Sequence, residues 1–90
     1  MISRAHVFIE GRVQGVFYRA FTRDQAVNLG LNGWVRNMPD GRVEAVFEGR
    51  VELIEQVIIA CKKGPPGAHV VIVNVIREPV AGDRGFEIRY

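Results

Sequence analysis

The stretch G-R-V-Q-G-V-F-Y-R, from Gly11 to Arg19, decides how this chain is organised. It follows an alternating apolar run at residues 7–9 and precedes residues with helical spacing, so it predicts a loop between a strand and a helix. Glycine adopts positive φ without steric cost, so Gly11 and Gly15 would let the N–H groups of residues 14–18 converge. Converging N–H groups at the start of a helix form a binding site for an anion.

Arg19 adds a permanently charged, planar side chain to this loop. A guanidinium can bind two oxygens of one phosphate at the same time. The loop alone is a weak signal, because an ordinary turn with a solvated arginine would look the same and neither common phosphate-loop spacing is present. The residues that we predict to bind phosphate are Gln14, Gly15, Val16, Phe17, Tyr18 and Arg19.

Outward from this loop, the chain alternates between strand and helix patterns. Alternating apolar residues predict strands over residues 4–10, 32–38, 42–48, 70–78 and 86–90. Helical spacing predicts helices over residues 18–29 and around residues 54–61, ended by Gly30 and Gly64. This β-α-β-β-α-β order with one extra strand predicts an α+β, ferredoxin-like fold, in which two helices cover one face of a four- to five-stranded, mostly antiparallel sheet.

Length and composition exclude several classes of protein. Ninety residues with 48% hydrophobic and 24% charged residues predict one globular domain over residues 1–90. No apolar run approaches the ~18 residues of a membrane span, and the N-terminus lacks the apolar core of a signal peptide, so we expect a cytoplasmic protein without a membrane partner. The net charge of +2 is spread along the chain, which argues against a nucleic-acid partner.

The second candidate residue is Asn37, in the run G-W-V-R-N-M-P-D-G from Gly33 to Gly41. An asparagine just before a turn commonly bonds to nearby backbone, and this interpretation stays open. Right-handed connections place the second strand close to the end of the first, so the hairpin can present Asn37 beside the glycine loop. A neutral amide there can hold a water molecule beside a bound phosphate, ready to attack it.

Together the two runs resemble the motifs of the acylphosphatase family. The first run is similar to the first family motif, and G-W-V-R-N-M-P-D-G-R-V-E-A is similar to the second. The segments G-P-P-G-A and G-F-E-I-R-Y further along also look like family features, so the resemblance covers nearly the whole chain. It implies a ferredoxin-like enzyme that hydrolyses the carboxyl–phosphate bond of small acyl phosphates without a metal or cofactor. It also implies two catalytic residues: Arg19, which holds the phosphate with the loop amides, and Asn37, which orients the attacking water.

Other reactive side chains favour structural roles. His6 and His69 lie in predicted strands and lack the close spacing or the carboxylate partner of a metal or base site. Cys61 lies on the apolar stripe of the second helix, where a small core residue is expected. Asp40 belongs to the turn Pro39-Asp40-Gly41, and we assign it no role as a general base. We therefore expect no metal site.

The strand over residues 70–78 is unusual because it is apolar on both faces. Charges would be expected on a solvent face, so this strand predicts weak self-association of an otherwise monomeric protein. The phosphate-binding loop predicts inorganic phosphate or sulfate as a competing anion.

Two other functions stay open. The same domain resembles the N-terminal part of hydrogenase-maturation proteins, which would imply a role with carbamoyl phosphate. A ferredoxin-like sheet can also bind RNA, but that requires clustered aromatic residues at the centre of a basic sheet, and Phe8 alone hardly supplies them.

Overall fold

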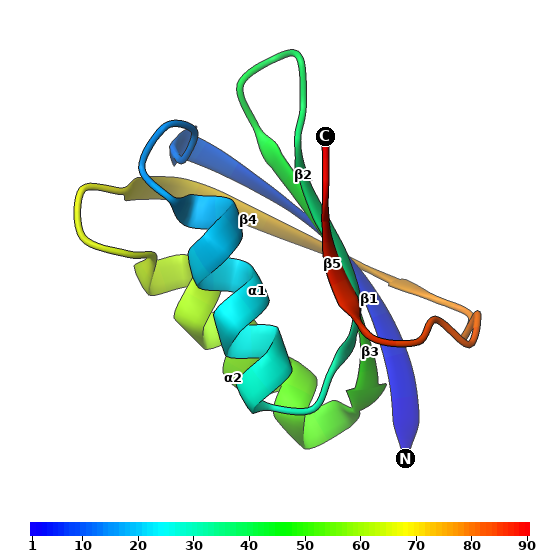
Figure 1. Cartoon of the computed structure of the whole chain (residues 1–90). Coiled ribbons are helices and arrows are strands. Elements are labelled where there is room, and N and C mark those ends of the chain that lie inside the picture. Colours follow the sequence, from blue (N-terminus) through cyan, green and yellow to red (C-terminus); the bar gives the residue numbers. More distant parts are fainter.

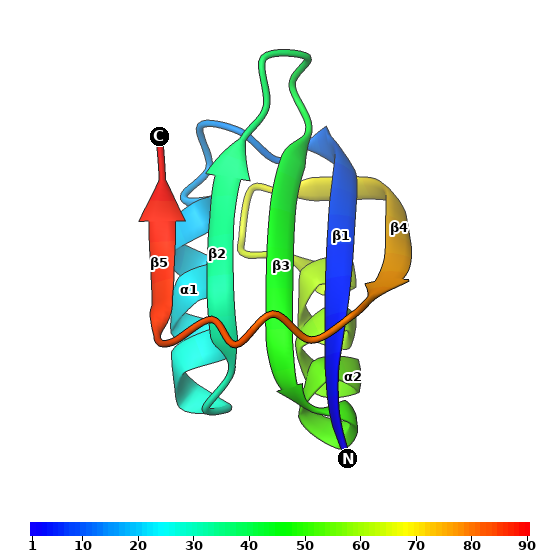
Figure 2. The same cartoon turned by 90° about the vertical axis from the view of Figure 1, so that its right-hand side faces the viewer.

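The protein is a five-stranded sheet with two helices on one face, seen from two directions in Figures 1 and 2. The computed structural model describes residues 1–90. In chain order the elements are β1 (Ile2–Arg12), α1 (Tyr18–Asn28), β2 (Asn32–Asn37), β3 (Val43–Arg50), α2 (Val51–Lys63), β4 (His69–Glu78) and β5 (Phe86–Arg89). The strands lie in the order β4-β1-β3-β2-β5, and every neighbouring pair is antiparallel except β2 and β5. The predicted α+β, ferredoxin-like arrangement is confirmed.

The core lies between the sheet and the two helices. Alternation along β1 turns Ala5, Val7 and Ile9 toward the helices, and all three are fully buried. Helix α1 buries a stripe spaced four residues apart, which begins at Tyr18, and α2 buries a stripe of its own. Helix α1 contacts β2 and β5, whereas α2 contacts β1, β3 and β4. No helix is both long enough and apolar enough to cross a membrane.

Gly11 lies within strand β1, and not at the start of the loop as the sequence predicted. Strand β1 runs on to Arg12, and its pairing with β4 shifts register between Glu10 and Gly11. At this bulge Gly11 has φ 132°, and a Cβ there would lie 2.1 Å from the carbonyl oxygen of His69. Gly11 therefore allows β4 to approach closely and does not flank the anion loop, which lies between Arg12 and Tyr18.

The connection from β4 to β5 crosses the face of the sheet that the helices leave open. Figure 2 shows this segment passing in front of β1, β3 and β2. The buried carboxylate of Glu48 accepts hydrogen bonds from the N–H groups of Ala81 and Gly82, each at 2.8 Å. Arg4 bridges Glu48 at 3.1 Å and Asp83 at 3.0 Å. These contacts hold the crossing segment against the sheet and deliver β5 to the edge beside β2 and α1.

His6 has two carboxylate partners, so the prediction that it lacks one was wrong. Its ring nitrogens lie 2.6 Å from Glu44 and 2.6 Å from Glu78, on the neighbouring strands β3 and β4. Cross-strand neighbours are far apart in sequence, and spacing along the chain does not detect them. Despite desolvation, the pKa of Glu44 is held below its usual value by Arg36 and His6. A network of hydrogen bonds and ion pairs therefore joins Arg36, Glu44, His6 and Glu78 on the sheet face that the helices leave open.

Candidate active site

The loop between β1 and α1 has the backbone of an anion site. Gly15 has φ 74°, and Phe17 is left-handed at φ 60°, ψ 26°. Left-handed residues at two positions of so short a loop turn successive N–H groups toward one side. The N–H of Phe21 donates to the carbonyl of Phe17 at 3.0 Å, and the N–H groups just before it have no acceptor within the helix. The start of α1 therefore offers free donors next to the loop.

Gln14 ties this loop to the β2–β3 hairpin. Its side-chain amide donates to the carbonyl oxygens of Met38 at 2.8 Å and Arg42 at 2.9 Å. Of the residues predicted to bind phosphate, Gln14 thus turns its side chain to the hairpin, whereas the half-buried Val16 packs against the core. Both hold the loop beside the strand that carries Asn37.

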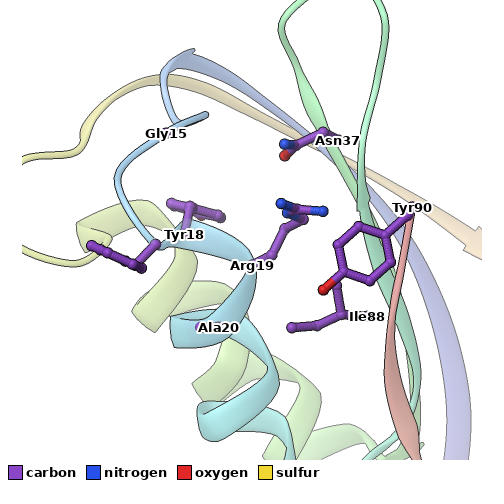
Figure 3. Close-up of a pocket in the computed structure, with 8 residues that line it drawn as sticks. Gly15, Tyr18, Arg19, Ala20, Asn37, Ile88 and Tyr90 are labelled. Atoms are coloured by element: carbon purple, nitrogen blue, oxygen red, sulfur yellow. The ribbon is translucent and has the colours of Figure 1, made fainter.

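A cavity of about 330 Å³ opens where the loop, the end of β2 and β5 meet. Figure 3 shows the Arg19 side chain reaching from α1 toward Asn37, with the ring of Tyr90 beside it. Arg19 and Asn37 both line this cavity. They meet there although β3 separates β1, which leads into the Arg19 loop, from β2, which carries Asn37. The residues lining it are Gly15, Phe17, Tyr18, Arg19, Ala20, Asn37, Ile88 and Tyr90.

Ile88 and Tyr90 were not among the predicted site residues. They enter the site because β5 pairs in parallel with β2 and packs beside α1. The Arg19 guanidinium carbon lies 4.8 Å from the centre of the Tyr90 ring, close enough for a cation–π contact. The alternation of residues 86–90 places Ile88 and Tyr90 on one face. Only the sheet topology shows that this face lies beside α1 and lines the cavity.

Arg19 is the only lining residue with a charged side chain at neutral pH, and no Asp or Glu side chain lines the cavity. Tyr18 is buried and its hydroxyl donates to the carbonyl of Cys61 at 2.7 Å, and burial raises the pKa of this phenol far above its ordinary value. Burial likewise raises the pKa of the Cys61 thiol to about 12, so it is not a nucleophile.

No group of three or more His, Cys, Asp or Glu side chains is placed to hold a metal ion. Chemically, the site can bind a small anion beside a neutral amide.

The family model described as Acylphosphatase matches residues 5–88. The chain belongs to the acylphosphatase family. An acylphosphatase from Aeropyrum pernix is 55% identical over 91 residues, which cover 99% of this chain and 90% of that protein. An acylphosphatase from Rubrobacter xylanophilus is 54% identical over 88 residues, with coverage of 97% and 80%. These matches support acylphosphatase as the enzymatic activity of the chain.

Solved structures agree with this acylphosphatase assignment. The crystal structure of acylphosphatase from Bacillus subtilis superimposes with a TM-score of 0.96 at 35% identity, and 100% of both chains is covered. Full-length HypF in its phosphate- and nucleotide-bound form contains a similar region, with a TM-score of 0.89 at 27% identity. That region covers 100% of this chain but 12% of the HypF chain, so the same domain also occurs within a much longer protein.

The open face of the acylphosphatase sheet carries more aromatic residues than Phe8 alone. His6 stacks on Phe8 at 4.6 Å and meets Trp34 edge-on at 6.0 Å. Phe8 therefore does not stand alone on this face. The face is not uniformly basic, however, because carboxylates lie among these rings and Arg36 pairs with Glu44 at 2.6 Å. An RNA-binding sheet combines its aromatic residues with a basic surface, and this face has mixed charge.

Proposed function

We propose that this chain hydrolyses the carboxyl–phosphate bond of small acyl phosphates to a carboxylate and inorganic phosphate, without a metal or cofactor. The observation that carries the proposal is the meeting of Arg19 and Asn37 in one cavity beside a loop with free N–H donors. The family assignment of the chain supports the same reaction.

In this mechanism the loop and Arg19 hold the phosphate. The N–H groups of residues 14–19 donate to its oxygens, and the guanidinium fork binds two of them and balances their charge. Negative charge that builds up on the equatorial oxygens during transfer meets the same donors, already in place. No other charged side chain lines the cavity to compete for Arg19.

Asn37 orients the water that attacks phosphorus. Its amide oxygen accepts a hydrogen bond from this water, and its NH₂ group can donate to the water or to the phosphate. The O–P bond to the water forms as the bond to the carboxylate oxygen breaks, and both protons of the water end on the phosphate product. The leaving carboxylate is stable near neutral pH, so it needs no general acid. This fits a cavity that no Asp, Glu, His, Cys or Lys side chain lines.

The decisive experiment is a phosphate-release assay on the purified chain. Benzoyl phosphate, carbamoyl phosphate and p-nitrophenyl phosphate are compared as an acyl phosphate, a carbamoyl phosphate and an ordinary phosphomonoester. We expect hydrolysis of benzoyl phosphate and no hydrolysis of the monoester. A clear preference for carbamoyl phosphate would favour the alternative role noted above, and turnover of the monoester alone would refute the proposal.

Two further measurements test the binding mode. Inorganic phosphate and sulfate should inhibit competitively, since the loop recognises the tetrahedral anion, and purely noncompetitive inhibition would place the anion elsewhere.

Activity should survive exhaustive chelation. Activity that chelation abolishes and one divalent ion restores would refute a metal-independent mechanism.

The setting of the enzyme is part of the proposal. We propose that residues 1–90 act as one domain, that the protein is monomeric with weak self-association, and that it works in the cytoplasm on small molecules. A single free, buried Cys61 is compatible with a reducing compartment.

A further inference from the structure

The turn that follows Asn37 projects from the sheet. Asn37 is the last residue of β2 and pairs with Val43 on β3. Beyond this pair, the N–H of Met38 donates to the carbonyl of Arg42 at 2.8 Å and closes the hairpin. Figure 2 shows the turn between β2 and β3 extending past the ends of the neighbouring strands. Contacts from outside the hairpin therefore bear on where this end of β2 lies.

One side chain supplies the hydrogen bonds between this turn and the rest of the chain. The Gln14 amide donates to the carbonyls of Met38 at 2.8 Å and Arg42 at 2.9 Å, so both of its N–H groups are used. Every other hydrogen bond of residues 38–42 stays within that segment. Gln14 thus binds the two residues that close the hairpin.

The Asn37 side chain has no hydrogen bond of its own to hold it. None of the side-chain hydrogen bonds in the structure involves its amide. The backbone on either side therefore sets its position, through the pairing with Val43 and through the Met38 carbonyl that Gln14 binds. Figure 3 shows Asn37 extending from the end of β2 toward Arg19.

Gln14 connects the two halves of the site. It directly precedes Gly15, which lines the cavity, but the half-buried Gln14 is not among the lining residues. Its side chain joins the loop proposed to bind phosphate to the strand end proposed to hold the water. A displacement of reacting groups by about 1 Å can cost about 10²-fold in rate. The link between loop and hairpin therefore bears on turnover.

We propose that the Gln14 side chain positions Asn37 for turnover, by holding the hairpin where the Asn37 amide can orient the attacking water. The inference rests on the proposed function and adds to it a positioning residue whose side chain acts through Asn37. Loss of this side chain should lower kcat and leave phosphate binding nearly unchanged, because Arg19 and the loop N–H groups remain. A link that served the fold alone would change stability and not kcat per folded molecule.

The first test is Gln14→Met, which keeps an unbranched side chain of similar length and removes both donors. The variant should fold, since the Met38 carbonyl still accepts from Gly41 and the Arg42 carbonyl from Met38. With benzoyl phosphate, kcat should fall by about tenfold to hundredfold. KM and the inhibition constant of inorganic phosphate should change by less than about threefold. Gln14→Asn, whose amide is one methylene further from the carbonyls, should show the same split.

A double-mutant cycle with Asn37→Ala separates positioning from stability. If Gln14 acts through Asn37, adding Gln14→Met to Asn37→Ala should lower kcat by less than about twofold further. The melting temperature should fall by a similar amount in both backgrounds. A loss of kcat of the same size in both backgrounds would overturn the proposal, because Gln14 would then act independently of Asn37.

Gln25→Met is the matched control, because Gln25 is a half-buried glutamine of α1 that does not line the cavity. It should keep the wild-type kcat. A folded Gln14→Met enzyme with the kcat of this control would overturn the proposal. A phosphate inhibition constant that rises as much as kcat falls would also overturn it, since the side chain would then serve the anion loop.

Nuclear magnetic resonance gives a measurement that does not depend on activity. The side-chain amide signal of Asn37, assigned by its absence in Asn37→Ala, should shift in Gln14→Met and not in Gln25→Met. An Asn37 signal at its wild-type position in Gln14→Met would overturn the proposal. A wild type that hydrolyses no acyl phosphate would refute the proposed function itself, and the amide signal would still test whether Gln14 positions Asn37.

Discussion

Asn37 is the residue whose role a single substitution can decide. If it orients the attacking water, Asn37→Ala should lower kcat by about 10² to 10³ while the inhibition constant of inorganic phosphate changes little. If it only stabilises the hairpin turn, the variant should lose about 1 kcal/mol of unfolding free energy and keep its activity per folded molecule. Measuring kcat, phosphate inhibition and melting temperature on one sample separates the two outcomes.

The matched control for this experiment is Asn74→Ala. Asn74 lies exposed on β4, outside the cavity, so its loss should leave kcat and stability nearly unchanged. A folded Asn37→Ala protein with the kcat of this control would exclude a catalytic role for Asn37.

Arg19 is expected to act on binding and turnover together. Arg19→Lys keeps the positive charge but loses the planar fork, so it should weaken phosphate inhibition and lower kcat. Arg23→Lys is the control, since Arg23 is exposed on the same helix and pairs only with its neighbour Asp24. Steady-state kinetics with phosphate as inhibitor measure both effects, and an Arg19→Lys enzyme as active as Arg23→Lys would contradict bidentate binding.

Single residues were predictable where their chemistry is local. Arg19 and Asn37 could be singled out because each sits at a recognisable break between a strand and the next element. The left-handed Phe17 gave no such signal, since that conformation is set by how the loop closes onto α1. The carboxylate partners of His6 also depend on strand register, which no local pattern in the chain contains.

Strand β4 is the element expected to cause self-association. It is an edge strand, and Val71, Ile72 and Ile76 are exposed on it. An apolar edge can pair with a second copy of the chain, and a lysine on such an edge disfavours that pairing. Val71→Lys should therefore lower the weight-average mass in sedimentation at high protein concentration.

The control for β4 is Val27→Lys, which puts the same charge on an exposed position of α1. It separates a local effect on the edge from the effect of added net charge. A wild-type protein that sediments as a monomer at every concentration, or an equal effect of both substitutions, would rule out β4 as the contact.

Elements were predicted better in kind than in extent. Strand β1 begins two residues before and ends two residues after the predicted range, because β3 and β4 pair with it on both sides. Helix α2 begins at Val51, directly after β3, without a capping side chain at Arg50. The end of strand β3 fixes where α2 starts. Glu52 in its first turn and the lysines in its last turn stabilise the helix through its dipole.

The whole molecule should lose stability in acid through its buried carboxylates. Despite desolvation, the pKa of Glu48 lies below its usual value because the N–H groups of Ala81 and Gly82 and the Arg4 side chain bond to the carboxylate. A carboxyl group with a folded-state pKa below its unfolded value stabilises the protein above the unfolded pKa. That stability is lost as the pH falls through the folded-state pKa, so urea unfolding should show a decline in unfolding free energy below about pH 5.

Glu48→Gln tests this assignment. Without the charge, the variant should be less stable than the wild type at pH 7 by about 1 kcal/mol, and the difference should shrink in acid. The exposed Glu55 on α2 provides the control variant Glu55→Gln, which should follow the wild-type curve. A Glu48→Gln protein whose stability difference is the same at every pH would show that the charge of Glu48 does not matter.

The segment that crosses the open face and leads to β5 also affects when the site forms during folding. The cavity combines the start of α1, the end of β2 and the tip of β5, and its last wall forms only when β5 pairs in parallel with β2 across the molecule. Helices form within microseconds, whereas pairing between distant segments is slow. During refolding, both helices can therefore form before the cavity has all of its walls, so enzymatic activity should return later than helical structure.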